Sequence, residues 1–167
     1  AVRIGDDTLS LAGDKIRFEA ASQVDSLNLN TSELARINSA IVRTQPGTSS
    51  PAALLDQRDA HLRNLSDTVG ISVGFEASGV VNSRLGDVAG PILLDGTQAS
   101  SMALVNNADG TIDFTLNGAL ANPESGALAG QSQALIAQRN LGNELDSLAQ
   151  QLIQQVNAAQ AGGTAPD

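Results

Sequence analysis

The chain has 167 residues, no cysteine and a formal net charge of −9, and only 2% of its residues are aromatic. This length suits one domain with a core of Leu, Ile, Val and Ala, while the lack of cysteine excludes disulfides, thiolate metal sites and a cysteine nucleophile. The acidic balance disfavours nucleic acids and anionic membranes as partners, and no apolar run has the length of a membrane span.

The first part of the chain has the period of a long helix. After a lead-in or frayed start over residues 1–13, the pattern from about Asp14 to Thr44 is helical. One face holds a heptad series and a second, increasingly polar series: Ala20, Leu27, Leu34 and Ile41, with Val24, Thr31 and Asn38. Because the second series becomes polar, we expect this helix to need a bundle around it.

A second helix is expected from Pro51 to about Val69. Residues 45–50 are rich in Pro, Gly and Ser and predict a short turn, so the two helices should form an antiparallel hairpin. Ser50 suits the N-cap, Pro51 the first helical position and Gly70 the C-terminal cap.

Residues 70–123 change to the alternation of strands. The apolar runs are separated by turn dipeptides such as Asp95-Gly96, Asp109-Gly110 and Asn117-Gly118. We expect a small antiparallel sheet of about four or five short strands, forming a domain of its own. Because the chain begins at Ala1 without an initiator Met, we also expect it to be an internal piece of a longer protein.

A third helix is predicted from near Glu124–Gly130 to about Ala159, before Gly162-Gly163. Its apolar stripe is Leu141, Leu145, Leu148, Leu152, Val156 and Ala159. The expected fold is α+β: residues 1–69 and 124–167 form a bundle of three long helices, a hairpin plus a returning helix. The β domain of residues 70–123 is inserted between them and should lie at one end.

Arg58 is the anomaly on the inner face of the second helix, where an aliphatic residue is usual. A buried guanidinium needs a carboxylate or carbonyl partner. The candidate carboxylates are Glu33 on the first helix and Glu144 or Asp146 on the third. We expect a salt bridge that fixes the register of the helices, the alternative being that Arg58 reaches solvent from the edge of the stripe.

Other polar residues favour structural roles. His61, the only histidine, has no evident catalytic or metal-binding set around it. Asp56 and Asp59 suit the helix N-terminal dipole, and Asp59 can pair with Arg63. The Asp-Gly turns lack the ligand pattern of a calcium loop. No phosphate-binding loop, dinucleotide fingerprint or nucleophile elbow is present, so we expect no catalytic, cofactor or metal site and no enzyme.

The order of these parts resembles a known family. The run Leu54-Leu55-Asp56-Gln57-Arg58-Asp59 follows a helix ending in Leu34-Ala-Arg-Ile-Asn-Ser-Ala-Ile41, and Gly126-Ala-Leu-Ala-Gly130 opens the last helix. This resembles the bacterial flagellar hook-associated protein that lies at the hook–filament junction, next to the hook. The chain departs from the family pattern after Gly130, with Gln131, Ser132 and Leu135, and lacks the terminal heptad segments.

The resemblance implies a structural adaptor between hook and filament. Its implied partners are the hook protein, the second junction protein and further copies of itself in a ring, and its implied location is the extracellular flagellum, reached by type III export without a cleaved signal peptide. The piece alone is expected to be monomeric in solution. The alternatives are a soluble adhesin-like binding module, which predicts a pocket at the sheet–helix junction, and another axial protein such as flagellin or the cap.

Overall fold

The computed structural model describes residues 2–44 and 52–163, with side chains from residue 7 onward. It contains three helices: α1 (Val2–Val42), α2 (Ala52–Thr68) and α3 (Ala127–Gly163). The predicted lead-in is therefore the start of α1, and the predicted turn with its Ser50–Pro51 cap lies outside the described residues. In the part of the chain that the structure describes, no helix is long and apolar enough to cross a membrane.

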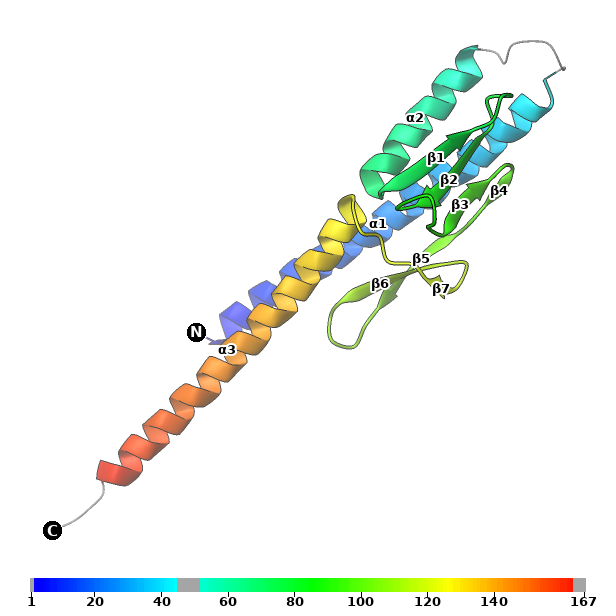
Figure 1. Cartoon of the computed structure of the whole chain (residues 1–167). Coiled ribbons are helices and arrows are strands. Elements are labelled where there is room, and N and C mark those ends of the chain that lie inside the picture. Colours follow the sequence, from blue (N-terminus) through cyan, green and yellow to red (C-terminus); the bar gives the residue numbers. More distant parts are fainter. Residues whose placement is uncertain (1, 45–51, 164–167) are drawn as a thin grey trace.

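The helices are arranged along α1, which is about 60 Å long at 1.5 Å per residue. In Figure 1, α2 runs antiparallel beside the C-terminal half of α1, while α3 lies beside its N-terminal half and extends past it. The hairpin and the returning helix are thus confirmed. However, α2 and α3 occupy successive lengths of α1 and meet only where α2 ends and α3 begins, because the 17-residue α2 ends at Thr68.

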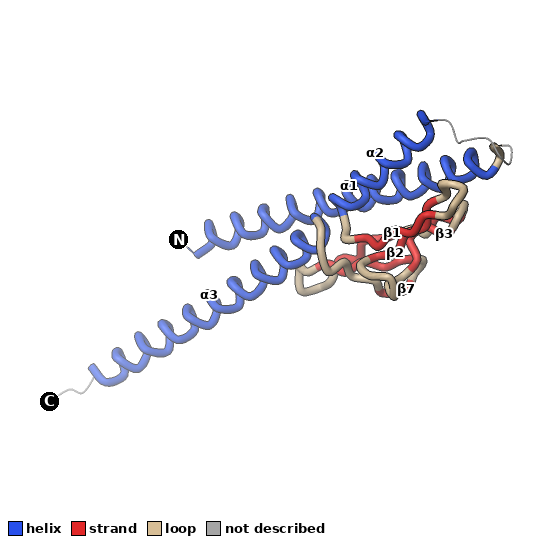
Figure 2. The backbone as a smooth tube through the Cα atoms, turned by 45° about the horizontal axis from the view of Figure 1, so that its top comes forward, coloured by secondary structure: helices blue, strands red, loops and turns tan. Residues whose placement is uncertain are grey.

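Seven strands form two separate antiparallel sheets where one sheet was expected. Sheet A, in the order β1-β2-β3-β4, and sheet B, in the order β5-β6-β7, have the following bounds: β1 (Ile71–Phe75), β2 (Val81–Leu85), β3 (Ile92–Asp95), β4 (Gln98–Ala99), β5 (Met102–Asn106), β6 (Ile112–Leu116) and β7 (Ala119–Leu120). The two-residue strands β4 and β7 are too short for sequence periodicity to indicate. The sheets lie along one side of α1 and not at the end of a bundle (Figure 2).

The predicted heptad face of α1 is the centre of the core. All seven of its positions are buried: Ala20, Val24, Leu27, Thr31, Leu34, Asn38 and Ile41. Phe114 of β6 and Leu128 of α3 are fully buried in the same cluster, which also includes residues of sheet A. The core is mainly aliphatic, as the composition predicts. The division at residues 70 and 123 stays a prediction, since one hydrophobic cluster includes both the helices and the sheets.

Candidate functional site

Arg58 lies where α2 faces the turn between β1 and β2. Its side chain is 12% exposed, and Nη1 donates to the carbonyl oxygen of Gly79 at 2.8 Å. Nε and Nη2 both reach the Asp59 carboxylate, at 2.8 and 2.7 Å. The guanidinium also lies over the ring of Phe75, 4.7 Å from its centroid. Arg58 therefore joins α2 to the first hairpin of sheet A.

These partners differ from the three carboxylates that the sequence indicated. Glu33 pairs with Arg36 on its own helix at 2.7 Å, and Glu144 and Asp146 lie on the exposed distal part of α3. A backbone carbonyl and the neighbouring carboxylate satisfy the guanidinium instead, so the expected helix–helix salt bridge is corrected to a helix–hairpin contact. A stabilising role for Arg58 stays a prediction.

Replacing Arg58 with leucine should lower the free energy of unfolding by about 1–2 kcal/mol, because a charge-assisted hydrogen bond to Gly79 is lost. Arg58→Lys should show part of this loss in stability, since an ammonium group cannot reproduce the planar array of donors of the guanidinium. Urea unfolding followed by circular dichroism measures both variants. An Arg58→Leu variant that is as stable as the unmodified chain, or more so, would exclude this role.

The rest of the Leu54–Asp59 run places α2 on the end of α1. Leu55 packs against Ile37, Ile41 and Val80, which form a small apolar cluster separate from the main core. Leu54 is half-buried, while Asp56 and Gln57 are exposed. The run thus supplies one packing face and one polar face to the same helical turn.

His61 connects the two helices of the hairpin. Its Nδ1 lies 2.8 Å from Oδ1 of Asn30, a buried residue whose Nδ2 donates to the carbonyl of Ser26. Because Oδ1 of Asn30 can only accept, Nδ1 of His61 carries the proton. Among the residues that the structure describes, no group of three or more His, Asp or Glu side chains is arranged to hold a metal ion.

Two asparagines of α1 hold the sheets to the helix through backbone groups. Asn38 is fully buried; its Nδ2 donates to the carbonyls of Val81 and Gly96 at 2.7 and 2.6 Å, and its Oδ1 accepts from the N–H of Val81 at 3.0 Å. Asn28 makes the same two-way contact with Met102 of β5, at 2.8 Å in both directions. Sheet A and sheet B are each anchored to α1 by one asparagine.

The chain leaves α2 and enters α3 through two segments that lie side by side, at Gly70 and at Ser125–Gly126. We call this pair of segments the neck. The N–H of Gly70, after α2, donates to the carbonyl of Ser125 at 3.1 Å. Gly126, which precedes α3, has a φ of +87°, and a Cβ on it would lie 2.7 Å from the carbonyl oxygen of Thr68 and from Cα of Val69. The start of α3 is therefore set directly against the end of α2.

The turn between β5 and β6 contacts both long helices. Oδ1 of Asp109 accepts from the hydroxyl of Thr111 at 2.6 Å, and Oδ2 accepts from Arg139 of α3 at 2.7 Å. These bonds lower the pKa of Asp109 to about 2, with Thr111 the larger cause. Arg17 of α1 donates to the carbonyl of Gly110 at 2.8 Å. The turn thus connects α1 and α3.

Stability should therefore decrease in acid. The pKa of Asp109 lies below its ordinary value of 3.8 in the folded chain, and hydrogen bonds from Asn107 and Asn122 lower the pKa of Asp113 as well. Carboxyls of this kind stabilise the fold above their unfolded pKa and lose that effect as the pH falls from about 4 towards 2. The free energy of unfolding, measured by denaturant titration across that range, should fall less steeply in Asp109→Asn. An equal slope in Asp109→Asn and in Asp95→Asn, a control at the end of β3 in sheet A, would contradict this.

The helices leave apolar faces open to solvent. The predicted stripe of α3 is exposed over its distal half, with Leu148, Leu152 and Ile153 each at least 60% exposed. On α1, Leu11, Phe18 and Leu29 lie on the face opposite to the buried heptad positions, and Phe18 is 76% exposed. The packing expected to cover the α3 stripe is absent from the described residues, because α2 runs along the other half of α1.

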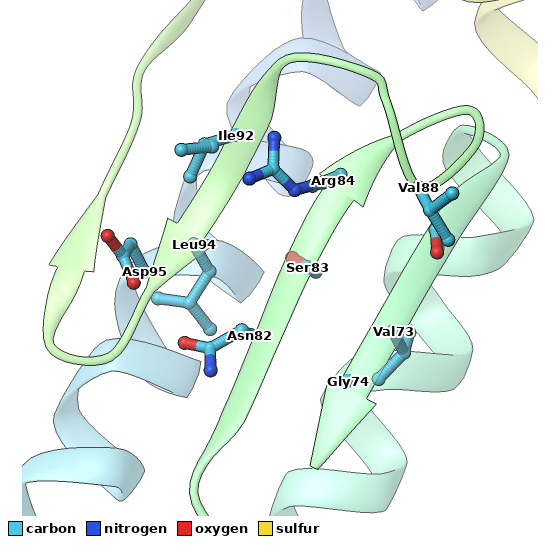
Figure 3. A pocket seen from close by; sticks show the side chains of 10 residues that line it. Val73, Gly74, Asn82, Ser83, Arg84, Val88, Ile92, Leu94 and Asp95 are labelled. Atoms are coloured by element: carbon cyan, nitrogen blue, oxygen red, sulfur yellow. The ribbon is translucent and has the colours of Figure 1, made fainter. Parts of the chain in front are cut away.

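Sheet A has a shallow depression on the face turned away from the helices (Figure 3). Its volume is about 240 Å³, and its lining includes Ser72, Gly74, Arg84, Val88 and Ile92. Pockets for small ligands usually have volumes of roughly 300–1,000 Å³ and bury most of the ligand. A second hollow of about 240 Å³ lies where the turn between β5 and β6 meets α1 and α3, and its lining includes Arg17, Asp109 and Arg139. It also falls below that range, so neither hollow has the size of the pocket that a binding module predicts.

Together these features define an elongated α+β scaffold module: one long helix, two sheets anchored to it, and apolar helix faces left open. The chain belongs to the FlgK family of flagellar hook-associated proteins, since the family model described as "Flagellar hook-associated protein FlgK helical domain" matches residues 2–167. The resemblance found at Leu54–Asp59 is thereby confirmed.

A solved structure supports the fold. The structure of the flagellar hook junction protein FlgK from Burkholderia pseudomallei matches with a TM-score of 0.63 and 23% sequence identity, covering 77% of this chain and 25% of that chain. The chain thus spans about a quarter of the length of that protein. A comparison with curated protein sequences finds no match.

Proposed function

We propose that the protein containing this chain joins hook and filament at the hook–filament junction of the bacterial flagellum, as a mechanical adaptor without catalytic activity. The observation that carries this proposal is the family match over residues 2–167. The solved relative, itself described as a flagellar hook junction protein, supports it through the shared fold.

The architecture suits a load-bearing part. α1 is continuous over 41 residues, and both sheets are held to it by asparagine side chains that bind backbone groups. The open apolar faces of α1 and α3 provide surfaces that neighbouring segments can cover in an assembly. These features support an axial structural role and do not require a bound ligand.

The proposed partners are the hook protein, the second junction protein and further copies in a ring. The proposed location is the outside of the cell, after type III export without a cleaved signal peptide. Without its neighbours, the isolated chain is expected to be a monomer at micromolar concentration, which analytical ultracentrifugation can measure.

Deletion of the gene tests the necessity of the adaptor. Cells without the protein should build hooks that carry no attached filament, and the gene supplied in trans should restore the filaments. Negative-stain electron microscopy distinguishes the two. Normal filaments on the deletion strain would overturn the proposal.

A further inference from the structure

The depression on sheet A has open space at its floor, above a glycine of β1. Gly74 is the fourth of the five residues of β1, in regular register with Asn82, and a Cβ added to it would meet nothing within 4 Å. A glycine inside a strand weakens the strand, and it is typical of a place where another chain or a ligand approaches closely. Among the described residues nothing occupies that space, which leaves it open to a group from outside them.

The lining has the composition of a small protein-binding hollow. Val88 is 80% exposed and Ile92 40% exposed at its apolar rim, and Arg84 provides a cation whose Nη1 is held by the carbonyl of Gly90 at 2.9 Å. Asp95 adds a carboxylate to the lining (Figure 3).

A matching knob is present on the opposite side of the same chain. Phe18 projects from the face of α1 turned away from the core and is 76% exposed. Asp25, also exposed, follows it on that face two turns later, and Lys15 lies beside it one turn earlier. This surface therefore offers a large apolar side chain to the apolar rim and a carboxylate to Arg84, while the ammonium of Lys15 lies 3.8 Å from the carboxylate of Glu19.

We propose that the depression on sheet A binds the Phe18 face of α1 from a second copy of this chain. Phe18 enters the hollow between Val88 and Ile92, above Gly74, and Asp25 approaches Arg84. Because the knob and the hollow lie on opposite sides of the molecule, the contact is head-to-tail and can repeat around a closed ring. The inference rests on the proposed function, to which it adds the contact between copies. One such contact is small, which agrees with a monomer in dilute solution.

Disulfide cross-linking on intact flagella tests this contact, since the chain has no cysteine of its own. The double variant Phe18→Cys/Val88→Cys should form a ladder of cross-linked copies on mild oxidation, at least tenfold above the control pair Phe18→Cys/Ala108→Cys. Each single variant should form no dimer, because a head-to-tail contact never places identical residues together. Equal cross-linking of both pairs, or dimers of a single variant, would overturn the proposal.

A second variant separates the contact from the fold. Gly74→Thr adds a side chain to the open floor, where it meets no neighbour, and should leave the melting temperature unchanged or raised. In the Phe18→Cys/Val88→Cys background it should reduce the cross-linked ladder at least fivefold, and an undiminished ladder would refute the role of the depression. Absence of the ladder in flagella with normal hook–filament junctions would reject this contact while leaving the adaptor function in place.

Discussion

Replacing Gly126 with alanine is expected to lower the free energy of unfolding by about 3–4 kcal/mol, because this position combines a positive φ with a close backbone approach. The residue has a φ of +87°, which costs an L-residue about 1–3 kcal/mol. The new Cβ would also lie 2.7 Å from backbone atoms of both Thr68 and Val69, which cannot rotate away. Relief of that clash must separate the start of α3 from the end of α2.

Gly130→Ala is the matched control, because Gly130 lies one turn into α3 and a Cβ there meets nothing within 4 Å. This variant should be neutral or up to about 1 kcal/mol more stable, since alanine favours the helix. Thermal unfolding compares the two: Gly126→Ala should melt roughly 10 °C lower than the unmodified chain. Equal melting temperatures for the two variants would show that the neck does not constrain the helices.

Replacing Asn38 with leucine should cost about 3–4 kcal/mol, although leucine restores the apolar heptad pattern of α1. The amide of Asn38 makes three hydrogen bonds to the backbone of Val81 and Gly96. Leucine would leave the N–H of Val81 buried and unpaired, and each such group costs roughly 1–3 kcal/mol. Chemical denaturation gives the loss, and amide hydrogen exchange at Val81 should accelerate.

Two comparisons sharpen this prediction. Asn38→Asp keeps the acceptor for Val81 but sets an anion against two carbonyls, so at pH 7 it should be at least as unstable as Asn38→Leu. Asn28→Leu removes the equivalent contact to Met102, but Asn28 is only half-buried, so this change should cost only about 1–2 kcal/mol. A stable, well-folded Asn38→Leu chain would contradict the anchoring role of the asparagine.

The helices could be predicted well because their periodicity is local. The seven heptad positions of α1 are all buried, and α2 lies within the range that Pro51 and Gly70 indicated. The short strands β4 and β7 were missed because two residues carry no period. The separation into two sheets depends on strand pairing, which the alternation of side chains does not determine.

The polar contacts could not be predicted in the same way. Asn38 weakens the heptad in the sequence, whereas in the fold it binds backbone groups 43 and 58 residues away. Arg58 was recognised as an anomaly, but its acceptor is the carbonyl of Gly79, and a backbone carbonyl has no sequence signal. The φ of Gly126 is likewise visible only once α2 and α3 meet.

The measurement that tests the adaptor role most directly is immunogold electron microscopy of intact flagella, with an antibody raised against this chain. The proposed function predicts a single band of label between hook and filament on each flagellum. Label along the whole filament would indicate that the protein is a filament subunit and not a junction protein. Label nowhere on the flagella of cells that make the protein would contradict the junction role altogether.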